Sequence, residues 1–360
     1  MRHNSEQFTR FGELSLKTFN RCLTLSLLAV AFAGCGSPQG EPNAKGPGAG
    51  AKPLKIGLVF DTGGRGDKSF NDSAYAGIER AKKELGIEEK TVDSTKEADY
   101  QTNIDALAEQ GCDLIIGVGV SMQKAIGEVA PKYPDMKFAI VDAPVDAKNV
   151  RSLVFKEEEG SFLAGYLAGL VTKTGKIGFV GGMDIPIIKK FESGYFAGAK
   201  TANPAVELLP AKYTGNWDNA DLGKQNAKVL FGQGADIVYH AAGRAGLGVI
   251  AAAQEENKWA IGVDGDQDGL AEGHVLTSMI KHVDVAVFQT IKDVQDGKWT
   301  PTVVTYDLKG DGVGLSPMRF TKATIGEAVL KRVQAMHDKI VSGELKVPST
   351  ADELATYLKK

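Results

Sequence analysis

Short apolar runs alternate with longer segments of helical pattern along most of the chain. The run at 55–60 contains almost no polar residue, which predicts a strand buried on both faces. Strands are predicted at residues 55–60, 91–93, 113–118, 137–141, 152–155, 176–180, 207–213, 236–240, 259–263, 275–280 and 302–307. Helices are predicted at residues 73–85, 103–109, 160–171, 187–201, 221–231, 247–257, 284–296 and 325–341. This alternation predicts βαβ units with parallel sheets, so the fold class is α/β.

The number of predicted strands favours two lobes over a single sheet, because an open sheet seldom exceeds about ten strands. KIGLVF begins at residue 55 and KIGFVGG begins at residue 176, and each is followed by a glycine turn and a helix. This limited internal similarity predicts two lobes of similar construction. Strand ends that face each other across two lobes form a cleft suited to a small ligand.

The segment after the first strand contains the clearest candidate binding residues. The strand stops at Asp61, and the glycines between residues 63 and 66 allow a tight loop. Ser69, with Asp72 three residues later, predicts the capped start of a helix whose first turn contains Phe70 and Asn71. Ligands of open α/β sheets lie beyond the carboxyl ends of the strands. A carboxylate, a ring and an amide gathered there favour a flat, hydrogen-bonding ligand such as a nucleobase.

Polar or aromatic residues also follow several later strands. Asp142 and Asp264 each end an apolar strand, Lys281 ends another, and Phe191 lies on the helix after a glycine turn. Each has an ordinary alternative, since Asp often caps helices or forms turns and Phe191 could belong to the core. Their recurrence at strand ends favours a shared binding cleft.

The first 34 residues predict a lipoprotein signal peptide. Basic residues precede the apolar run at 23–33, which is too short for a permanent membrane-spanning helix. Phe32-Ala-Gly-Cys35 resembles a bacterial lipobox, which implies lipidation of Cys35; an ordinary secretory peptide cut nearby is the alternative. Residues 35–53 are rich in Gly, Pro and Ala, and they predict a flexible tether.

Cysteine count and charge exclude other classes. With Cys22 in the leader and Cys35 at the anchor, Cys112 is left alone, so the mature chain has no internal disulfide and no thiol zinc site. The leader contains four basic and two acidic residues, so the remainder has a net charge of −5 against −3 for the whole chain. No basic patch with interleaved aromatic residues is present, which argues against nucleic-acid binding.

Together these motifs resemble the basic membrane protein family, bacterial lipoproteins that bind purine nucleosides for ABC importers. The resemblance rests on the lipobox, the Asp61 loop through Ser69-Phe70-Asn71, Ile140-Val-Asp142, Gly182-Met183-x-Ile-Pro186 with Phe191, Gly262-Val-Asp264 and Lys281. It implies the type I periplasmic-binding-protein fold, with two doubly wound lobes joined by three crossovers. We expect lobe 1 at 54–156 and 266–298, lobe 2 at 157–265 and 299–347, and a C-terminal tail at 348–360.

The resemblance also implies a role for each site residue. Phe70 and Phe191 would stack on the two faces of the base, as aromatic rings do with any nucleobase. Asn71 and Asp142 would bind the base edge, with Asp61 close by, and Asn71 could offer both a donor and an acceptor. Asp264 and Lys281 would hold the ribose hydroxyls. The implied partners are guanosine, inosine or adenosine, the permease and ATPase subunits of an importer, and the membrane through the lipid anchor, with no cofactor or metal.

Other functions stay open on the sequence alone. An enzyme that cleaves nucleosides could use His240 or His274 as a base, but no nucleophile elbow or metal-ligand spacing accompanies them. The segment 264–269 imitates an EF-hand start, yet Val275 occupies the twelfth position in place of Glu. The same fold could instead bind a sugar or a signalling molecule, or belong to a surface adhesin or sensor subunit.

Overall fold

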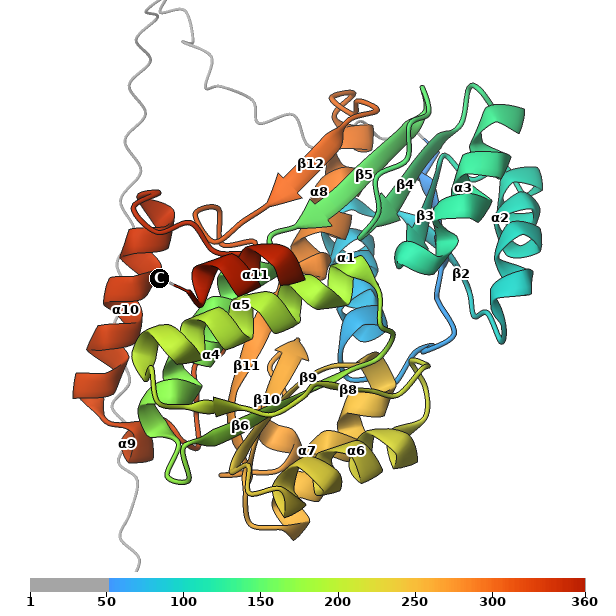
Figure 1. Cartoon of the computed structure of the whole chain (residues 1–360). Helices are drawn as coiled ribbons and strands as arrows, with labels where there is room; N and C mark the ends of the chain where they lie inside the picture. The colour runs from blue at the N-terminus through green and yellow to red at the C-terminus, as the bar shows by residue number, and fades with distance from the viewer. Residues whose placement is uncertain (1–51, 360) are drawn as a thin grey trace, which may run out of the picture. The chain divides into compact units, whose positions relative to one another are not determined.

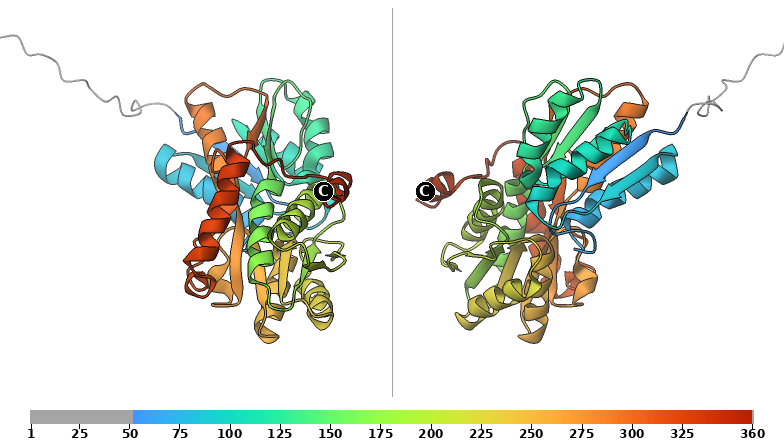
Figure 2. Two further views of the ribbon diagram at one scale, coloured as in Figure 1. Left: turned by 60° about the vertical axis from the view of Figure 1, so that its left-hand side comes forward. Right: turned by 90° about the vertical axis from the view of Figure 1, so that its right-hand side faces the viewer.

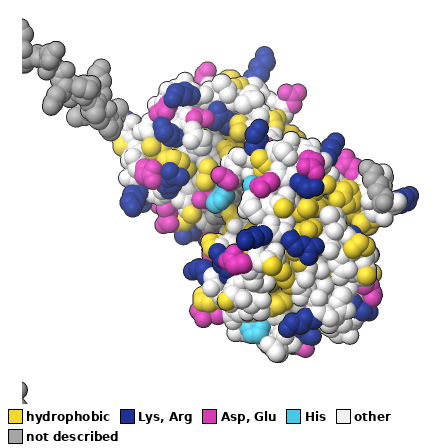
Figure 3. Space-filling model, turned by 90° about the vertical axis from the view of Figure 1, so that its left-hand side faces the viewer, with side chains coloured by type: hydrophobic (Ala, Val, Ile, Leu, Met, Phe, Trp, Pro, Cys, Tyr) yellow, Lys and Arg dark blue, Asp and Glu magenta, His cyan; other side chains and the backbone are white. Residues whose placement is uncertain are grey.

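The computed structural model describes residues 52–359. The predicted signal peptide, the lipidation site Cys35 and most of the predicted tether lie outside the described residues. Between residues 52 and 359, no helix is both long and apolar enough to cross a membrane. On the face shown in Figure 3, Lys and Arg side chains are interspersed with Asp and Glu rather than gathered into a patch.

The first sheet has six strands in the order β12-β5-β4-β3-β1-β2, all paired in parallel. They are β1 (Lys55–Val59), β2 (Glu88–Val92), β3 (Leu114–Val118), β4 (Lys137–Val141), β5 (Val150–Phe155) and β12 (Val303–Tyr306). One face is covered by α1 (Phe70–Leu85) and α8 (Val283–Gln295), the other by α2 (Tyr100–Glu109) and α3 (Gln123–Val129) (Figure 1). Because helices cover both faces, the central strands are apolar at nearly every position, as the sequence predicts.

The second sheet has seven strands, in the order β13-β11-β10-β9-β6-β7 with β8 also paired to β6. They are β6 (Lys176–Gly181), β7 (Glu207–Leu208), β8 (Lys212–Tyr213), β9 (Ile237–Ala241), β10 (Trp259–Asp264), β11 (Val275–Lys281) and β13 (Val313–Leu315). Helices α4 (Glu157–Val171) and α5 (Pro186–Ala202) cover one face, and α6 (Ala220–Gly232) and α7 (Gly246–Glu255) cover the other (Figure 2). Strand β13 pairs antiparallel to β11, whereas the other pairs are parallel.

The chain passes between the two sheets three times, as the family resemblance implies. The passages run from β5 to α4, from β11 to α8 and from β12 to β13. The expected boundaries at 266 and 299 need correction, because β11 pairs with β10 in the second sheet and β12 pairs with β5 in the first. The polar segment 265–274 does not lead into the first lobe. It connects β10 to β11, which pairs with β10 in the same sheet. The second lobe therefore continues to residue 281, and the first lobe continues to residue 306.

Several shorter elements were not predicted. They are helix α3, helix α11 (Ala351–Tyr357), strand β13 and the 3-10 helices η1 (Glu97–Asp99), η2 (Val120–Met122), η3 (Ala130–Lys132), η4 (Gly243–Ala245) and η5 (Asp268–Leu270). The helix predicted at 325–341 is α10 (Glu327–Val341), and Gly326, whose φ is 83°, separates it from the short preceding helix α9 (Lys322–Ile325). In the expected tail, α11 packs against α5, and the Tyr357 hydroxyl lies 2.9 Å from Thr201 Oγ1.

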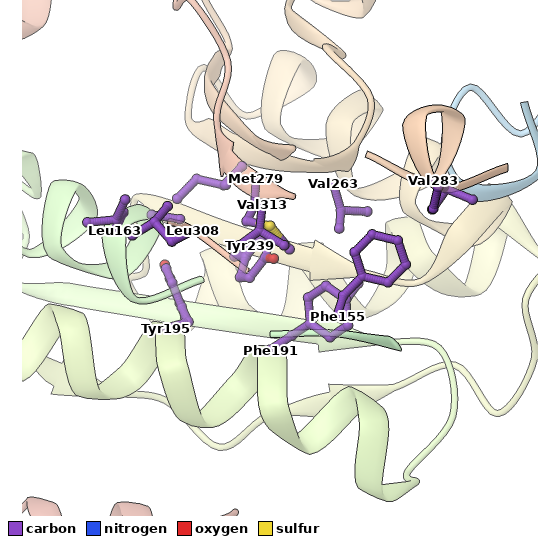
Figure 4. Close-up of a cluster of buried hydrophobic side chains, with 14 of the residues drawn as sticks. Phe155, Leu163, Phe191, Tyr195, Tyr239, Val263, Met279, Val283, Leu308 and Val313 are labelled. Carbon is purple, nitrogen blue, oxygen red and sulfur yellow. The ribbon is translucent and has the colours of Figure 1, made fainter. Parts of the chain in front are cut away.

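The core between α4, α5 and the second sheet is rich in aromatic residues (Figure 4). The Tyr195 and Tyr239 ring centroids lie 5.1 Å apart. Gly165 permits the close approach of α4 to α5, because a Cβ atom there would lie 1.9 Å from the Tyr195 carbonyl oxygen. Phe155 and Phe191 lie at one end of this cluster (Figure 4) and connect the core to the cleft described next.

Candidate functional site

A pocket at the carboxyl ends of both sheets contains every candidate ligand-binding residue. Its unfilled volume is about 570 Å³, part of it open to solvent. The candidates that line it are Asp61, Phe70, Asn71, Asp142, Phe191, Asp264 and Lys281. The first four come from the first lobe and the last three from the second, so the pocket is formed only where the two lobes meet.

Asp67 caps the helix that presents Phe70 and Asn71. Its carboxylate accepts hydrogen bonds from the backbone N–H groups of Ser69 (3.0 Å), Asn71 (2.8 Å) and Asp72 (3.1 Å). The sequence prediction of a Ser69–Asp72 capping pair is therefore wrong, although the helix does begin at Phe70. Ser69 is instead free to donate its hydroxyl across the cleft to Asp264 Oδ2, at 2.5 Å.

Two hydrogen bonds fix the orientation of the Asn71 side chain, which lines the pocket. Its Nδ2 donates to Asp61 Oδ1 at 2.8 Å and to Asp67 Oδ2 at 3.2 Å. Its Oδ1 is buried and has no hydrogen-bond partner among the described residues. Asn71 therefore offers the pocket an acceptor, not the donor and acceptor expected from its residue type.

Lys281 joins the two lobes inside the pocket. Its Nζ lies 2.5 Å from Asp142 Oδ2 and 3.9 Å from Glu157 Oε1, and only 2% of its side chain is exposed. Burial by itself would lower the pKa of Lys281, but the nearby carboxylates, Asp142 first among them, raise it. The ammonium also lies 4.7 Å from the Phe70 ring centre and 5.5 Å from that of Phe191, so both rings border the same cation.

Asp142 and Asp264 have left-handed backbones at matching places in the two lobes. Asp142 follows β4 with a φ of 71°, and Asp264 ends β10 with a φ of 64°. Left-handed conformations are uncommon outside glycine and are enriched at functional sites, with Asp among the residues that tolerate them. Asp142 Oδ1 is buried without a hydrogen-bond partner among the described residues, so it is a second acceptor available to a ligand.

Comparison with known proteins agrees with this geometry. Residues 54–351 match the family model described as ABC transporter substrate-binding protein PnrA-like. The chain is 37% identical over 356 residues to the ABC transporter nucleoside-binding protein BmpA of Lactococcus lactis, an alignment covering 91% of this chain and 99% of that protein. It is 34% identical over 355 residues to basic membrane protein A of Borreliella burgdorferi, covering 95% and 99%. The chain belongs to this basic membrane protein, or PnrA-like, family.

A solved structure of an ABC transporter solute-binding protein from Aeropyrum pernix confirms the expected fold. It superposes with a TM-score of 0.77 at 32% identity, over 85% of this chain and 98% of that one. The type I periplasmic-binding-protein fold, inferred from the resemblance, is thus shown. The matching family model describes substrate-binding proteins of ABC transporters.

Burial raises the pKa of two carboxylates of the pocket, Asp61 and Asp264. It raises the pKa of Asp61 to about 6, even though hydrogen bonds from Asn71 and Gly63 act in the opposite direction. It likewise raises the pKa of Asp264 to about 6, against the opposing effects of Lys281 and Ser69. These carboxylates are therefore easier to protonate than ordinary ones.

Sequence reasoning missed two residues beside the ligand pocket, Trp217 and Glu157. Trp217 lines it in the loop after β8, and its ring lies so close to Gly182 that a Cβ atom there would be 2.3 Å away. Glu157 follows β5, is fully buried between Lys281 and Lys190, and has its pKa raised by burial to about 7. Both follow predicted strands, so the rule that identified Asp142 and Asp264 could also have identified them.

The histidines considered for an enzyme are not part of the pocket lining. His240 is fully buried, burial lowers its pKa to about 4, and its Nε2 lies 3.0 Å from Gln267 Oε1. His274 Nδ1 lies 3.1 Å from the Lys258 carbonyl oxygen, at the start of β11 and away from its carboxyl end. In the segment that imitates an EF-hand, Asp268 accepts hydrogen bonds from Ser316 Oγ and the Arg319 N–H. Between residues 52 and 359, no group of His, Cys, Asp and Glu has the arrangement of a metal site.

Proposed function

We propose that this protein is an extracytoplasmic, lipid-anchored binding protein that captures a purine nucleoside between its lobes and delivers it to an ABC importer. The observation that supports this most directly is a pair of buried acceptors beside Phe70 and Phe191, Asn71 Oδ1 and Asp142 Oδ1, for which residues 52–359 supply no hydrogen-bond donor. A buried acceptor without a hydrogen bond costs about 1–3 kcal/mol, so a ligand that supplies N–H donors to both is favoured.

The base is the part of the ligand that these residues fit. Phe70 and Phe191 come from opposite lobes, so a base stacked on both rings would connect the lobes. Acceptors at Asn71 and Asp142 require donors on the base edge. Guanine has N–H donors at N1 and N2, hypoxanthine has one at N1, and adenine has an exocyclic amino group. We therefore expect guanosine to bind more tightly than inosine or adenosine.

The sugar would occupy the side of the pocket that contains Asp264 and Lys281. The Lys281 ammonium has three donors and uses one on Asp142, so the others can bind ribose hydroxyls. Asp264 can accept from a vicinal hydroxyl while it holds Ser69. Asp61, Asp142 and Asp264 outnumber Lys281, so a phosphate would be repelled in this partly desolvated site.

Calorimetry with guanosine, inosine and adenosine, beside their monophosphates and free ribose, tests the proposal. We expect nucleosides to bind, monophosphates to bind far more weakly, and ribose alone to give no measurable heat. Tighter binding of the monophosphates would contradict the assignment, and tight binding of a sugar would favour the alternative ligand class. Chromatography of the recovered guanosine separates binding from cleavage, since a hydrolase or phosphorylase would release guanine.

The lipid anchor is tested separately. Cys35 is the only acylation site proposed, so Cys35→Ala should move the leader-processed protein into the soluble fraction. Cys112→Ala is the matched control, because Cys112 is a buried free thiol in the first lobe and should not affect membrane attachment. Membrane association that persists in Cys35→Ala would exclude lipidation at this position.

A further inference from the structure

Arg244 in the second lobe is hydrogen-bonded to the first lobe. It lies in η4, the 3-10 turn that follows β9 at the carboxyl edge of the second sheet. Its Nε donates to the Gly63 carbonyl oxygen at 2.9 Å, and its Nη2 donates to the Arg65 carbonyl oxygen at 2.5 Å. Both acceptors belong to the glycine-rich loop, residues 61–69, which leads into α1.

Among the described residues, the Arg244 guanidinium bonds to backbone carbonyls of the first lobe and forms no ion pair. Across the described residues, no carboxylate lies within ion-pair distance of Arg244, whereas many other Lys and Arg side chains form ion pairs inside one lobe. The two hydrogen bonds of Arg244 can therefore form only while the two lobes are in contact. When the lobes separate, these charge-assisted hydrogen bonds are exchanged for bonds to water.

The turn that holds Arg244 is also part of the ligand pocket. Gly243 lines the pocket, and the Ala245 N–H donates to the Trp217 carbonyl oxygen at 3.1 Å. On the other side, the loop that Arg244 holds contributes Asp61 and Gly63 to the same pocket. A ligand that contacts both Trp217 and the glycine-rich loop would therefore hold Arg244 next to its two acceptors.

Two further side chains connect the second lobe to this loop. Gln267 Nε2 donates to the Lys68 carbonyl oxygen at 3.0 Å, and Ser69 Oγ donates to Asp264 Oδ2 and lies 3.4 Å from the Val263 carbonyl oxygen. Gln267 is itself oriented by the Val263 N–H, which donates to its Oε1 at 3.0 Å. Arg244 is the member of this set that lies outside the proposed ribose site and supplies two bonds from one side chain.

We propose that Arg244 is a positioning residue that holds the lobes closed and thereby sets how long a bound nucleoside is retained. The proposal rests on the proposed nucleoside function and extends it from ligand contacts to ligand release. Its contacts form after the lobes approach each other. Removal of the guanidinium should therefore raise the dissociation rate while the association rate stays nearly constant.

Stopped-flow release of guanosine from the full-length chain in detergent tests this inference. Arg244→Ala should raise the dissociation rate by about tenfold, the equivalent of about 1.4 kcal/mol and of one charge-assisted hydrogen bond. Arg244→Lys, which retains the charge and one donor direction, should give an intermediate rate. Arg319→Ala is the matched control, since Arg319 pairs with Asp266 inside the second lobe with 55% of its side chain exposed. It should release guanosine at the wild-type rate.

Hydrogen exchange of the glycine-rich loop provides a readout that does not depend on guanosine. We expect the amides of residues 63–69 to exchange faster in Arg244→Ala than in the wild type and in Arg319→Ala. If the wild type fails to bind guanosine, the proposed function fails, and unchanged exchange would then overturn the closure role as well. If guanosine binds but leaves Arg244→Ala and the wild type at equal rates, the closure role alone is overturned.

Discussion

The two lobes have the same strand order but different chemistry at their carboxyl ends. Strands β1, β3, β4 and β5 of the first sheet correspond in place to β6, β9, β10 and β11 of the second. Asp142 and Asp264 occupy matching positions after β4 and at the end of β10, and both have positive φ. The two lobes therefore share both their strand order and a left-handed Asp at the same place. The similarity between KIGLVF and KIGFVGG predicted two lobes of similar construction.

The connections after the first strand of each lobe account for the difference. In the first lobe, a long loop separates β1 from α1, and Asp61, Phe70 and Asn71 follow from it. In the second lobe, the short segment 182–185 connects β6 to α5, so the ring that faces the pocket is Phe191, further along the helix. The first lobe supplies Asn71 and Asp142 for the base edge, and the second supplies the buried cation Lys281 together with Asp264. The pocket is chemically complete only when the lobes meet.

The largest expected effect follows removal of the cation that joins the lobes. Lys281→Met should destabilise the protein by about 3–5 kcal/mol, because Asp142 would remain buried without its cation and Glu157 would keep only Lys190. Urea unfolding measures it. Lys292→Met is the control, since Lys292 is paired on the surface with Asp296 and such pairs contribute about 0–1 kcal/mol.

A second variant shows whether the loss comes from the unpaired carboxylate. In Lys281→Met combined with Asp142→Asn, part of the stability should return, because the nearest buried negative charge is removed with its partner. Equal unfolding free energies for the single and double variants would mean that packing, and not charge, dominates at Lys281.

The next largest effect is the loss of an aromatic ring from either lobe, which should affect binding of the base and not of the ribose. Phe70→Ala and Phe191→Ala should each weaken guanosine by about 1–3 kcal/mol, and should weaken guanine similarly, because stacking does not involve the ribose. Asp264→Ala should weaken guanosine while barely affecting guanine. Calorimetry with both ligands measures this. Phe320→Ala, at an exposed position outside the pocket, is the control.

Much of this architecture was predictable because parallel strands buried on both faces give unbroken apolar runs, as at β1, β3 and β4. The rule that ligands lie beyond strand ends located Asp61, Asp142, Asp264 and Lys281 beside one pocket. Strand pairing was harder to predict, because the sequences of β11 and β12 do not indicate which of the two sheets each strand joins. The boundaries at 266 and 299 were displaced for that reason.

Side-chain orientation was the other part that the sequence did not determine. The residue type alone allows Asn71 to be both a donor and an acceptor. In the structure its amide nitrogen already donates to Asp61 and Asp67, so only the amide oxygen is left for a ligand. Capping was misassigned similarly, since Ser69 is a usual N-cap residue but Asp67 supplies the cap. Trp217 lies four residues beyond the end of β8, whereas Asp142 and Asp264 lie directly at their strand ends, so its place beside the pocket is less evident from the sequence.

A smaller effect is expected from crowding the second-lobe wall. Gly182→Ala would place a Cβ atom 2.3 Å from the Trp217 ring, so the ring must move. We expect guanosine to bind about 1 kcal/mol more weakly, the lower end of overpacking costs, since Trp217 is only half-buried. Gly265→Ala is the control, because its nearest neighbour would be 4.0 Å away. Equal affinity in both variants would mean that Trp217 does not contact the ligand.

The last expected effect is the pH dependence that Asp264 contributes. Burial raises its pKa from the ordinary value of 3.8 to about 6, so between these values the folded protein holds a proton that the unfolded chain has released. Stability from this group is therefore greatest at low pH and falls as pH rises toward 6, at up to about 1.4 kcal/mol per pH unit. Asp264→Asn removes this dependence, so its stability relative to the wild type should increase between pH 4.5 and 6 and then level off.

Unfolding in urea at half-unit pH steps measures that difference. His240, whose pKa is lowered to about 4, has the opposite dependence, but it is present in both proteins and cancels. Asp296→Asn is the control, because the Lys292 hydrogen bond lowers the pKa of the exposed Asp296 and places its titration below this window. A difference between Asp264→Asn and the wild type that stays constant from pH 4.5 to 6 would show that Asp264 titrates normally. Its burial by the first-lobe loop would then have no electrostatic consequence.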